Sequence, residues 1–243
     1  MFMKLPIFNA QNEKLDVSFH EGSRENVLIV LGHGVTGNKD RPLLVAVAEG
    51  LAARGWPCLR ISYSGNGDSE GRFVDATITK EIADLQSVLD AIPETTRVVY
   101  CGHSMGGAVG VLTAVRDERI RVLVTLAGMV FTQEFVEREF GDIVPDQGVM
   151  WDEPTCPLSQ AYVDDLKGQV STVDAAAAME VPWLLIHGTE DDVIFPRDSE
   201  AAYAAAPEHK KLITIPGADH SFDETSYPKI IEEIDAWLGK HLG

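Results

Sequence analysis

Cysteine is scarce in this sequence, and its three occurrences lie far apart. Cys58, Cys101 and Cys156 form no Cys-x-x-Cys pair, so the sequence excludes a disulfide framework and a cysteine zinc cluster. Two of them fall within apolar, strand-like runs, where free thiols are commonly buried. We therefore expect structural thiols without a catalytic or metal-binding role.

Positive charge is also in short supply. Lysine and arginine total 20 against 38 aspartates and glutamates, which gives a formal net charge of −18. Such a surface repels phosphate backbones and anionic lipid headgroups, so we expect neither nucleic acid nor a membrane as a partner. The sequence carries no signal for an oligomeric state.

Long apolar runs are missing as well. No stretch approaches the roughly 18 residues that a membrane span needs, and the N-terminal residues show no apolar run with a small-residue cleavage site. No His-x-His, His-Glu-x-x-His or P-loop pattern occurs. These absences predict a cytoplasmic protein that uses no metal and no cofactor.

The sequence does contain a regular alternation of short β-branched runs and longer amphipathic stretches. This alternation predicts βαβ units, and hence an α/β fold with a mainly parallel sheet. The expected buried strands are 27–31, 58–62, 98–101, 122–126, 183–187 and 212–215. The expected helices are 42–54, 79–91, 105–116, 199–206 and 226–238. Weaker segments near Leu5 and Val17 predict an antiparallel hairpin at the sheet edge.

The alternation breaks once, where more than fifty residues separate two predicted strands. The chain therefore divides into core residues 1–128, an insertion at 129–179 and core residues 180–243. Phe135 lies in an amphipathic stretch of the insertion, and Trp151 and Tyr162 follow it. Residues 129–178 also hold ten acidic and two basic residues. The insertion is either a solvated helical cap or a lid whose apolar side lines a substrate pocket.

The pattern Gly-x-Ser-x-Gly occurs twice, around Ser69 and around Ser104, so the pattern alone names no nucleophile. Only Ser104 stands between a strand-like run and an apolar helical pattern that begins with small residues. A sharp strand-to-helix turn exposes a serine hydroxyl at a helix N-terminus, where the helix dipole favours developing negative charge. Asp68 and Glu70 would instead repel an oxyanion at Ser69. We expect Ser104 to be the nucleophile and Ser69 to lie in a structural loop.

A serine nucleophile needs a base and an orienting carboxylate. Asp191 and Asp192 follow one predicted strand, and His220 follows the next, which gives the chain order serine, aspartate, histidine. Acyl transfer also needs N–H donors for the oxyanion. Val35, in the Gly-rich loop after the first strong strand, and Met105, after the serine, are the candidate donors.

Together these motifs resemble the α/β-hydrolase superfamily over nearly the full chain. The segments that carry the resemblance are Gly-His-Gly-Val-Thr-Gly-Asn-Lys, Ser-Gly-Asn-Gly-Asp-Ser-Glu-Gly, Gly-His-Ser-Met-Gly-Gly, His-Gly-Thr-Glu-Asp-Asp and Gly-Ala-Asp-His-Ser-Phe. They look most like small capped carboxylesterases of the cinnamoyl (feruloyl) esterase type and serine-aminopeptidase-like hydrolases. The resemblance implies a central sheet with helices on both faces and a lid insertion after the sixth strand. It also implies a Ser104, Asp191 and His220 triad, because the His-Gly-x-x-Asp spacing selects Asp191 over Asp192.

The expected activity is hydrolysis of small neutral carboxylic esters, including aromatic-acid esters, through an acyl-enzyme. Val35 and Met105 would bind the oxyanion, and Phe135, Trp151 and Tyr162 are candidate substrate contacts. A thioesterase, a C–C bond hydrolase or a peptidase could use the same residues, because fold and triad do not fix the substrate. A non-catalytic ligand-binding scaffold would be expected to lack a triad member, and none is missing.

Overall fold

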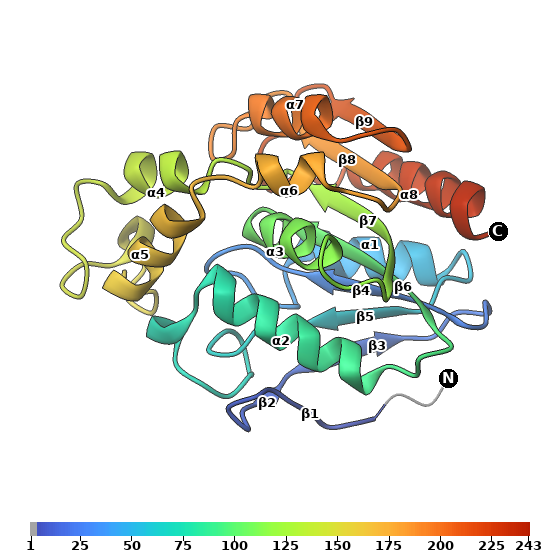
Figure 1. Ribbon diagram of the computed structural model, residues 1–243, viewed down its shortest axis with the longest axis horizontal. Coiled ribbons are helices and arrows are strands. Elements are labelled where there is room, and N and C mark those ends of the chain that lie inside the picture. The colour runs from blue at the N-terminus through green and yellow to red at the C-terminus, as the bar shows by residue number, and fades with distance from the viewer. Residues whose placement is uncertain (1–3) are drawn as a thin grey trace.

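The computed structural model describes residues 4–243, which fold around a seven-stranded sheet (Figure 1). The strand order is β3-β5-β4-β6-β7-β8-β9, with β3 antiparallel to β5 and every other neighbouring pair parallel. The strands are β3 (Val17–His20), β4 (Val27–Gly32), β5 (Cys58–Ile61), β6 (Arg97–His103), β7 (Ile120–Leu126), β8 (Trp183–Gly188) and β9 (Lys210–Ile215). The α/β prediction is confirmed.

Helices cover both faces of this sheet. On one face lie α1 (Pro42–Ala52) and α8 (Tyr227–Leu242), and on the other lie α2 (Ile78–Ala91), α3 (Met105–Ala114) and α7 (Pro196–Ala205) (Figure 1). Because both faces are covered, all six residues of β4 are buried, and the strand is a continuous apolar run instead of an alternating one. Each face has its own cluster of buried hydrophobic side chains.

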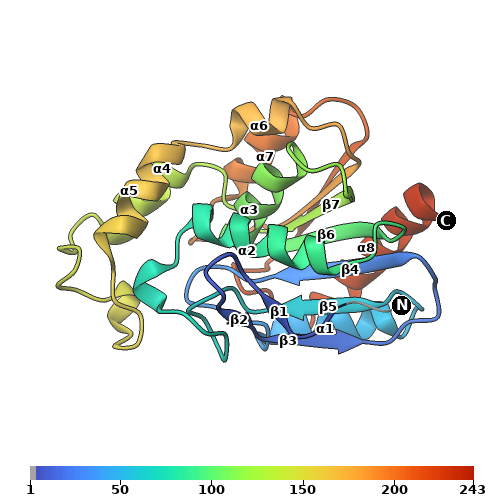
Figure 2. The same cartoon turned by 60° about the horizontal axis from the view of Figure 1, so that its bottom comes forward.

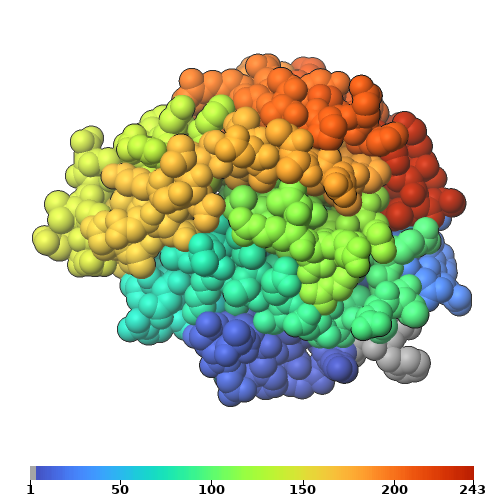
Figure 3. Space-filling model, viewed as in Figure 1, coloured from blue at the N-terminus to red at the C-terminus, as the bar shows by residue number. Residues whose placement is uncertain are grey.

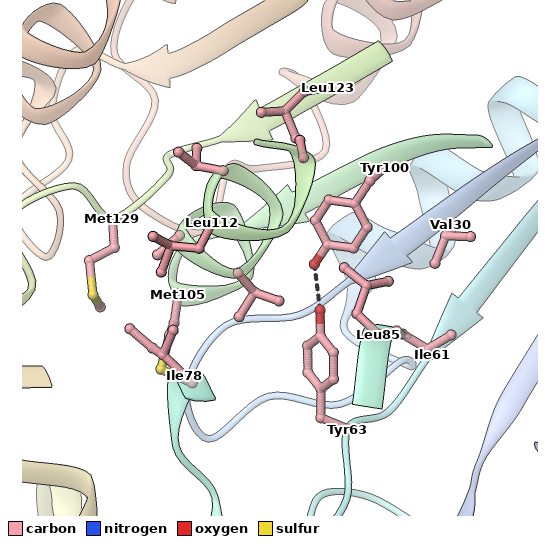
Figure 4. Close-up of a cluster of buried hydrophobic side chains, with 14 of the residues drawn as sticks. Val30, Ile61, Tyr63, Ile78, Leu85, Tyr100, Met105, Leu112, Leu123 and Met129 are labelled. Atoms are coloured by element: carbon pink, nitrogen blue, oxygen red, sulfur yellow. Dashed lines mark hydrogen bonds between the residues drawn. The ribbon is translucent and has the colours of Figure 1, made fainter. Parts of the chain in front are cut away.

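A pair of buried tyrosines connects the sheet to the turn that follows β6. The Tyr100 hydroxyl donates to the Gly106 carbonyl at 3.0 Å, so the hydroxyl of Tyr63 donates to that of Tyr100 (Figure 4). Burial raises the pKa of both phenols, which therefore stay protonated. Through Tyr100 the pair is therefore hydrogen-bonded to the first turn of α3.

The N-terminal segment differs from its prediction. β1 (Ile7–Phe8) and β2 (Lys14–Leu15) form a separate two-stranded antiparallel sheet, whereas Val17 in β3 pairs with Ile61 of β5. The expected hairpin between the Leu5 and Val17 segments is therefore wrong. The Asn9 side chain explains the difference: it accepts the N–H groups of residues 11 and 13 and closes the turn before β3 begins.

The insertion leaves the sheet at the end of β7 and returns at the start of β8. In chain order β7 is the fifth strand of the seven-stranded sheet, so the insertion follows the fifth strand of this sheet and not the sixth. It contains α4 (Thr132–Phe140), the 3₁₀ turn η2 (Met150–Asp152), α5 (Gln160–Gln169) and α6 (Val173–Ala177). Figures 1 and 2 show α4 and α5 beyond the sheet, whereas α6 lies near α3 and α7. In the space-filling view the part of the insertion that contains α4 and α5 forms one end of the molecule (Figure 3). A second 3₁₀ turn, η1 (Phe73–Asp75), contacts α5 from the core. None of the helices in residues 4–243 is long and apolar enough to cross a membrane.

Candidate active site

Ser104 occupies the sharp turn between β6 and α3. Its φ of 56° and ψ of −122° are unusual for a residue with a side chain, and the surrounding backbone holds them. The Ser104 N–H donates to the Leu126 carbonyl at 3.0 Å, and the Ser104 carbonyl accepts the N–H groups of Gly107 and Met129. A Cβ on Gly102 would lie 2.2 Å from the carbonyl oxygen of residue 106, so this turn requires glycine there.

A histidine and an aspartate from two other loops complete a hydrogen-bonded chain with this serine. His220 Nε2 lies 3.0 Å from Ser104 Oγ, and His220 Nδ1 lies 2.8 Å from Asp191 Oδ2. Asp191 follows β8 and His220 follows β9, and all three residues meet where parallel strands end at one edge of the sheet. The structure therefore brings together the three residues that the sequence predicts.

The Asp191 carboxylate is firmly fixed. Its Oδ1 accepts the N–H groups of Val193 and Ile194 at 3.0 and 2.8 Å. Burial would raise the pKa of Asp191, but hydrogen bonds from His187 and His220 outweigh it, so the pKa lies below its ordinary value. The neighbouring Asp192 is exposed. The choice of Asp191 over Asp192 therefore agrees with the geometry.

His187 is a buried contact of this aspartate that sequence reasoning missed. Its Nε2 lies 2.8 Å from the Ile194 carbonyl and 3.2 Å from Asp191 Oδ2. Because both are acceptors, this nitrogen carries a hydrogen, and Nδ1 faces the Ser199 hydroxyl at 2.6 Å. The sequence signal was present in the His-Gly-x-x-Asp spacing, but the histidine looked like an ordinary strand end.

Two further histidines brace the site in neutral form. His103 Nε2 donates to the His220 carbonyl at 2.9 Å, and burial, with a contribution from His220, lowers the pKa of His103 to about 3. His33 Nδ1 donates to the Gly34 carbonyl at 2.7 Å, and its Nε2 accepts the Tyr63 N–H at 3.0 Å. Burial lowers the pKa of His33 to about 4. Both side chains position loops around the serine.

Val35 and Met105 offer their backbone N–H groups near the serine. Neither N–H has a hydrogen-bond acceptor within residues 4–243. The adjacent Gly34 allows the loop that carries Val35 to approach Ser104, because a Cβ on Gly34 would lie 2.6 Å from Ser104 Cβ.

The sequence of residues 32–37 also fits the nucleotide-binding pattern Gly-x-Gly-x-x-Gly. In a nucleotide-binding loop a helix follows this pattern directly, whereas here α1 begins only at Pro42. The absence of a cofactor stays a prediction.

The second Gly-x-Ser-x-Gly copy has a different environment. The Ser69 hydroxyl donates to the Ser62 carbonyl and accepts the Asp16 N–H, both at 2.8 Å. Gly65, Gly67 and Gly71 all have positive φ, which defines an irregular loop. Within residues 4–243 no histidine is hydrogen-bonded to Ser69, so this serine has the structural environment that was expected.

The candidate substrate contacts fall in three different places. Trp151 lines a cavity of about 510 Å³ that contains Ser104 and His220. Tyr162 lines a second, much smaller cavity behind Val35 and Met105, where its hydroxyl has no partner among the described residues. Phe135 lines neither. Its ring lies 6.3 Å from that of Trp151, so Phe135 packs beside the residue that lines the cavity.

Metal and thiol chemistry find no support in the part of the chain that the structure describes. Residues 4–243 contain no group of three or more His, Cys, Asp and Glu side chains that could hold a metal ion. All three cysteines are free and buried, and burial raises the pKa of each thiol. The structural role expected for the cysteines agrees with this burial.

Comparisons with known proteins place this geometry in a family. The model of the "Alpha/beta hydrolase family" matches residues 29–233. The chain belongs to the alpha/beta hydrolase family. Together with esterase structures among its structural neighbours, this membership supports a hydrolase.

Among solved alpha/beta hydrolases, the structure resembles Est1E from Butyrivibrio proteoclasticus with ferulic acid bound. The TM-score is 0.86 at 24% identity, with 97% of this chain and 98% of that chain covered. An uncharacterized protein of Mycobacterium tuberculosis is 28% identical over 210 residues, which are 84% of this chain but 65% of that protein. Mitochondrial palmitoyl-protein thioesterase ABHD10 of Rattus norvegicus is 23% identical, with 83% of this chain and 71% of that protein covered. These identities establish a shared fold but not a shared substrate.

Proposed function

We propose that this chain is a carboxylic-ester hydrolase that works through a serine acyl-enzyme. The observation that carries the proposal is the hydrogen-bonded chain of Ser104, His220 and Asp191 beside two N–H groups that have no acceptor within residues 4–243. Nucleophile, base, orienting acid and oxyanion donors are the four parts that acyl transfer needs.

In the first half-reaction, Ser104 Oγ attacks the ester carbonyl carbon while its proton passes to His220 Nε2. The carbonyl oxygen becomes an oxyanion that the N–H groups of Val35 and Met105 stabilise. Asp191 stays ionised, because its pKa is held low, and it stabilises the imidazolium through Nδ1–H. His220 then returns the proton to the leaving alcohol, which leaves an acyl group on the serine.

In the second half-reaction, water takes the place of the alcohol. His220 accepts a proton from the water, whose oxygen attacks the acyl carbon, and the same N–H groups stabilise the second oxyanion. Collapse of this intermediate returns the proton to Ser104 and releases a carboxylic acid. The balance is one water consumed, one alcohol and one acid formed.

For the substrate we propose small esters, with esters of aromatic acids among them, and we assign the insertion a lid role. Trp151, the only contribution of the described insertion residues to the lining of the larger cavity, offers an aromatic surface beside Ser104. The acidic insertion should repel the multiply anionic coenzyme A group more than it repels a small ester.

A thioesterase is the second candidate, because one relative is a palmitoyl-protein thioesterase. The two proposals share every catalytic step and differ in the leaving group, which is a thiol instead of an alcohol. A C–C bond hydrolase or a peptidase would use the same residues, but no observed contact favours either.

Two measurements test the proposal. Intact-mass spectrometry after exposure to a fluorophosphonate probe should show one adduct, and peptide mapping should locate it on Ser104. A chain-length series of 4-nitrophenyl esters, with the matching thioesters, should then show which bond is cleaved faster. A folded protein that gains no adduct and hydrolyses none of these esters would contradict the proposal.

A further inference from the structure

The cavity that contains Ser104 and His220 differs from the whole chain in the charged residues that line it. The sequence holds 38 acidic residues against 20 lysines and arginines, yet no aspartate or glutamate lines this cavity, and Arg41 is its one lining cation among the described residues. Asp191 lies behind His220 with a fully buried side chain. A substrate in the cavity therefore meets a guanidinium and no carboxylate wall.

The guanidinium of Arg41 is not neutralised by its neighbours. Its side chain makes a single hydrogen bond, from Nη2 to the Thr36 carbonyl at 3.0 Å. The adjacent carboxylate, Asp40, is engaged by Lys39 and Arg60 at 2.7 and 2.8 Å, and these two cations lower the pKa of Asp40. Within residues 4–243 no carboxylate pairs with Arg41, and most of its five N–H donors remain unused.

Arg41 lines the same cavity as Ser104 and His220. Arg41 directly precedes Pro42, the first residue of α1, and its hydrogen bond to Thr36 ties it to the loop that carries Val35. Burial is the main cause of the lowered pKa of His33 and of His103, and the charge of Arg41 makes a smaller contribution to both. Arg41 is exposed to solvent, but its charge also acts on these two buried histidines.

Building on the proposed ester hydrolysis, we propose that Arg41 binds a carboxylate of the substrate, so that small esters with one negative charge are preferred over their neutral isosteres. A planar guanidinium with free donors matches a carboxylate in shape and charge. The sequence-based preference for neutral esters follows from the net charge of the surface, whereas this preference follows from the lining of the cavity.

The surroundings limit the preference to a single charge. Asp219, Asp223 and Glu224 act electrostatically on Tyr227, which also lines the cavity. Together with the acidic insertion, they oppose a substrate that carries several negative charges. A singly charged ester can hold its carboxylate at Arg41, while a polyphosphate group would extend toward these acids.

The test compares matched esters in one assay. On the acyl side, the mono-4-nitrophenyl ester of adipic acid is paired with 4-nitrophenyl heptanoate; on the alcohol side, 4-acetoxybenzoate is paired with 4-acetoxybenzamide. In the wild type, the anionic member of at least one pair should have a kcat/KM about tenfold higher, the scale of one partly exposed charged hydrogen bond. The gain should lie in KM, because Arg41 contacts the carboxylate before and during the reaction.

Arg41→Gln should bring this ratio to about one, and Arg41→Lys should keep part of it, because lysine retains the charge without the planar fork. A ratio measured on one sample cancels any loss of folded protein. Arg54→Gln is the matched control: it removes the same charge just after α1, where Arg54 faces Asp235, and it should leave the ratio unchanged.

The outcomes separate this inference from the proposed function. Hydrolysis of both members of each pair, with the same ratio in wild type and Arg41→Gln, would overturn the role of Arg41 and leave the esterase intact. A wild type that prefers the neutral member of both pairs would also overturn it. No hydrolysis of any ester by a folded protein with intact Ser104 would overturn the proposed function itself.

Discussion

The carboxyl edge of the sheet and the insertion differ in how they hold their side chains. At the sheet edge, both carboxylate oxygens of Asp191 are occupied by two backbone N–H groups and by two histidines. In the insertion, Trp151 makes ring contacts with Phe135 and Phe140 and, within residues 4–243, a single side-chain hydrogen bond, from Nε1 to Glu139 at 3.0 Å. It is 42% exposed and has a φ of 46° that is unusual for a bulky residue.

This difference agrees with the roles proposed for the two regions. The proposed acyl transfer would tolerate little misplacement of the reacting atoms, and the residues assigned to it lie in the loops that follow parallel strands and are held by directional bonds. A surface that selects among acyl groups works through apolar contact, which has no strict direction. Substitutions at the sheet edge should therefore remove rate, and substitutions in the insertion should change preference.

The largest effect is expected at Ser104. Ser104→Ala should lower kcat by about 10⁵-fold or more, because the nucleophile is lost while the turn keeps its backbone bonds. The matched control is Ser69→Ala in the other Gly-x-Ser-x-Gly copy, which should leave kcat nearly unchanged. Steady-state rates on one ester, with thermal unfolding as a fold check, decide the matter. If Ser69→Ala abolished activity and Ser104→Ala did not, Ser69 would be the nucleophile and the assignment of Ser104 would be wrong.

The next largest effect is expected at Asp191. Asp191→Asn should reduce kcat by about 10⁴-fold, because an amide no longer fixes the tautomer and orientation of His220. Asp192→Asn removes an exposed carboxylate from the adjacent position and should have a modest effect. Equal losses of kcat in the two variants, measured on the same ester, would contradict the assignment of Asp191 alone as the residue that orients His220.

A smaller effect is expected at His187, and the pH dependence of kcat/KM should reveal it. His187→Leu removes an N–H from Asp191 Oδ2, which leaves more negative charge to stabilise the His220 imidazolium. The acidic limb of kcat/KM should therefore move to higher pH. Because Asp191 also loses one of the groups that hold it in place, kcat should fall by about 10- to 100-fold. His33 and His103, with pKa values of about 4 and 3, should add no second protonation above pH 5.

Ser199→Ala is the milder companion of this variant. It removes the hydroxyl that faces His187 Nδ1 at 2.6 Å and should shift the limb in the same direction by less. A purely structural role for His187 would lower the amount of folded enzyme without moving the limb. An unmoved profile in both variants would therefore count against a positioning role.

Insertion variants should change preference instead of rate. Trp151→Ala should shift the relative kcat/KM among acyl groups by roughly 1 to 3 kcal/mol, the scale of one hydrophobic contact in a pocket. Phe135→Ala should give a smaller shift in the same direction, because Phe135 supports Trp151 and lines neither cavity. A uniform loss on every ester in the series would show that these rings only hold the insertion together.

The smallest expected effect comes from the long-range field of the insertion. Its acidic excess should slow the approach of acyl-coenzyme A, and added salt should relieve this, because the Debye length falls from about 30 Å at 0.01 M to about 10 Å at 0.1 M. The kcat/KM for a neutral ester should barely change with salt. Fast acyl-coenzyme A hydrolysis that salt slows would favour the thioesterase candidate.

The sequence predicted more of the carboxyl edge of the sheet than of the insertion, and the reason is physical. Buried strands are continuous apolar runs, and residues 27–32 could be assigned on that basis alone. The serine turn requires glycines at fixed offsets, as the close contact at Gly102 shows. In the insertion, Phe135 and Trp151 are equally apolar in sequence, but only packing decides that Trp151 lines the cavity and Phe135 lies beside it.

By itself, the sequence determined the α/β class, the strand-to-helix turn at Ser104 and the order of serine, aspartate and histidine, because these depend on local backbone preferences and on strand ends. Only the tertiary structure decided that His187 joins His220 on Asp191, and that Arg41 reaches the cavity while Asp40 is engaged by other cations. Such contacts join side chains from segments whose relative positions depend on packing, which short-range sequence patterns do not encode.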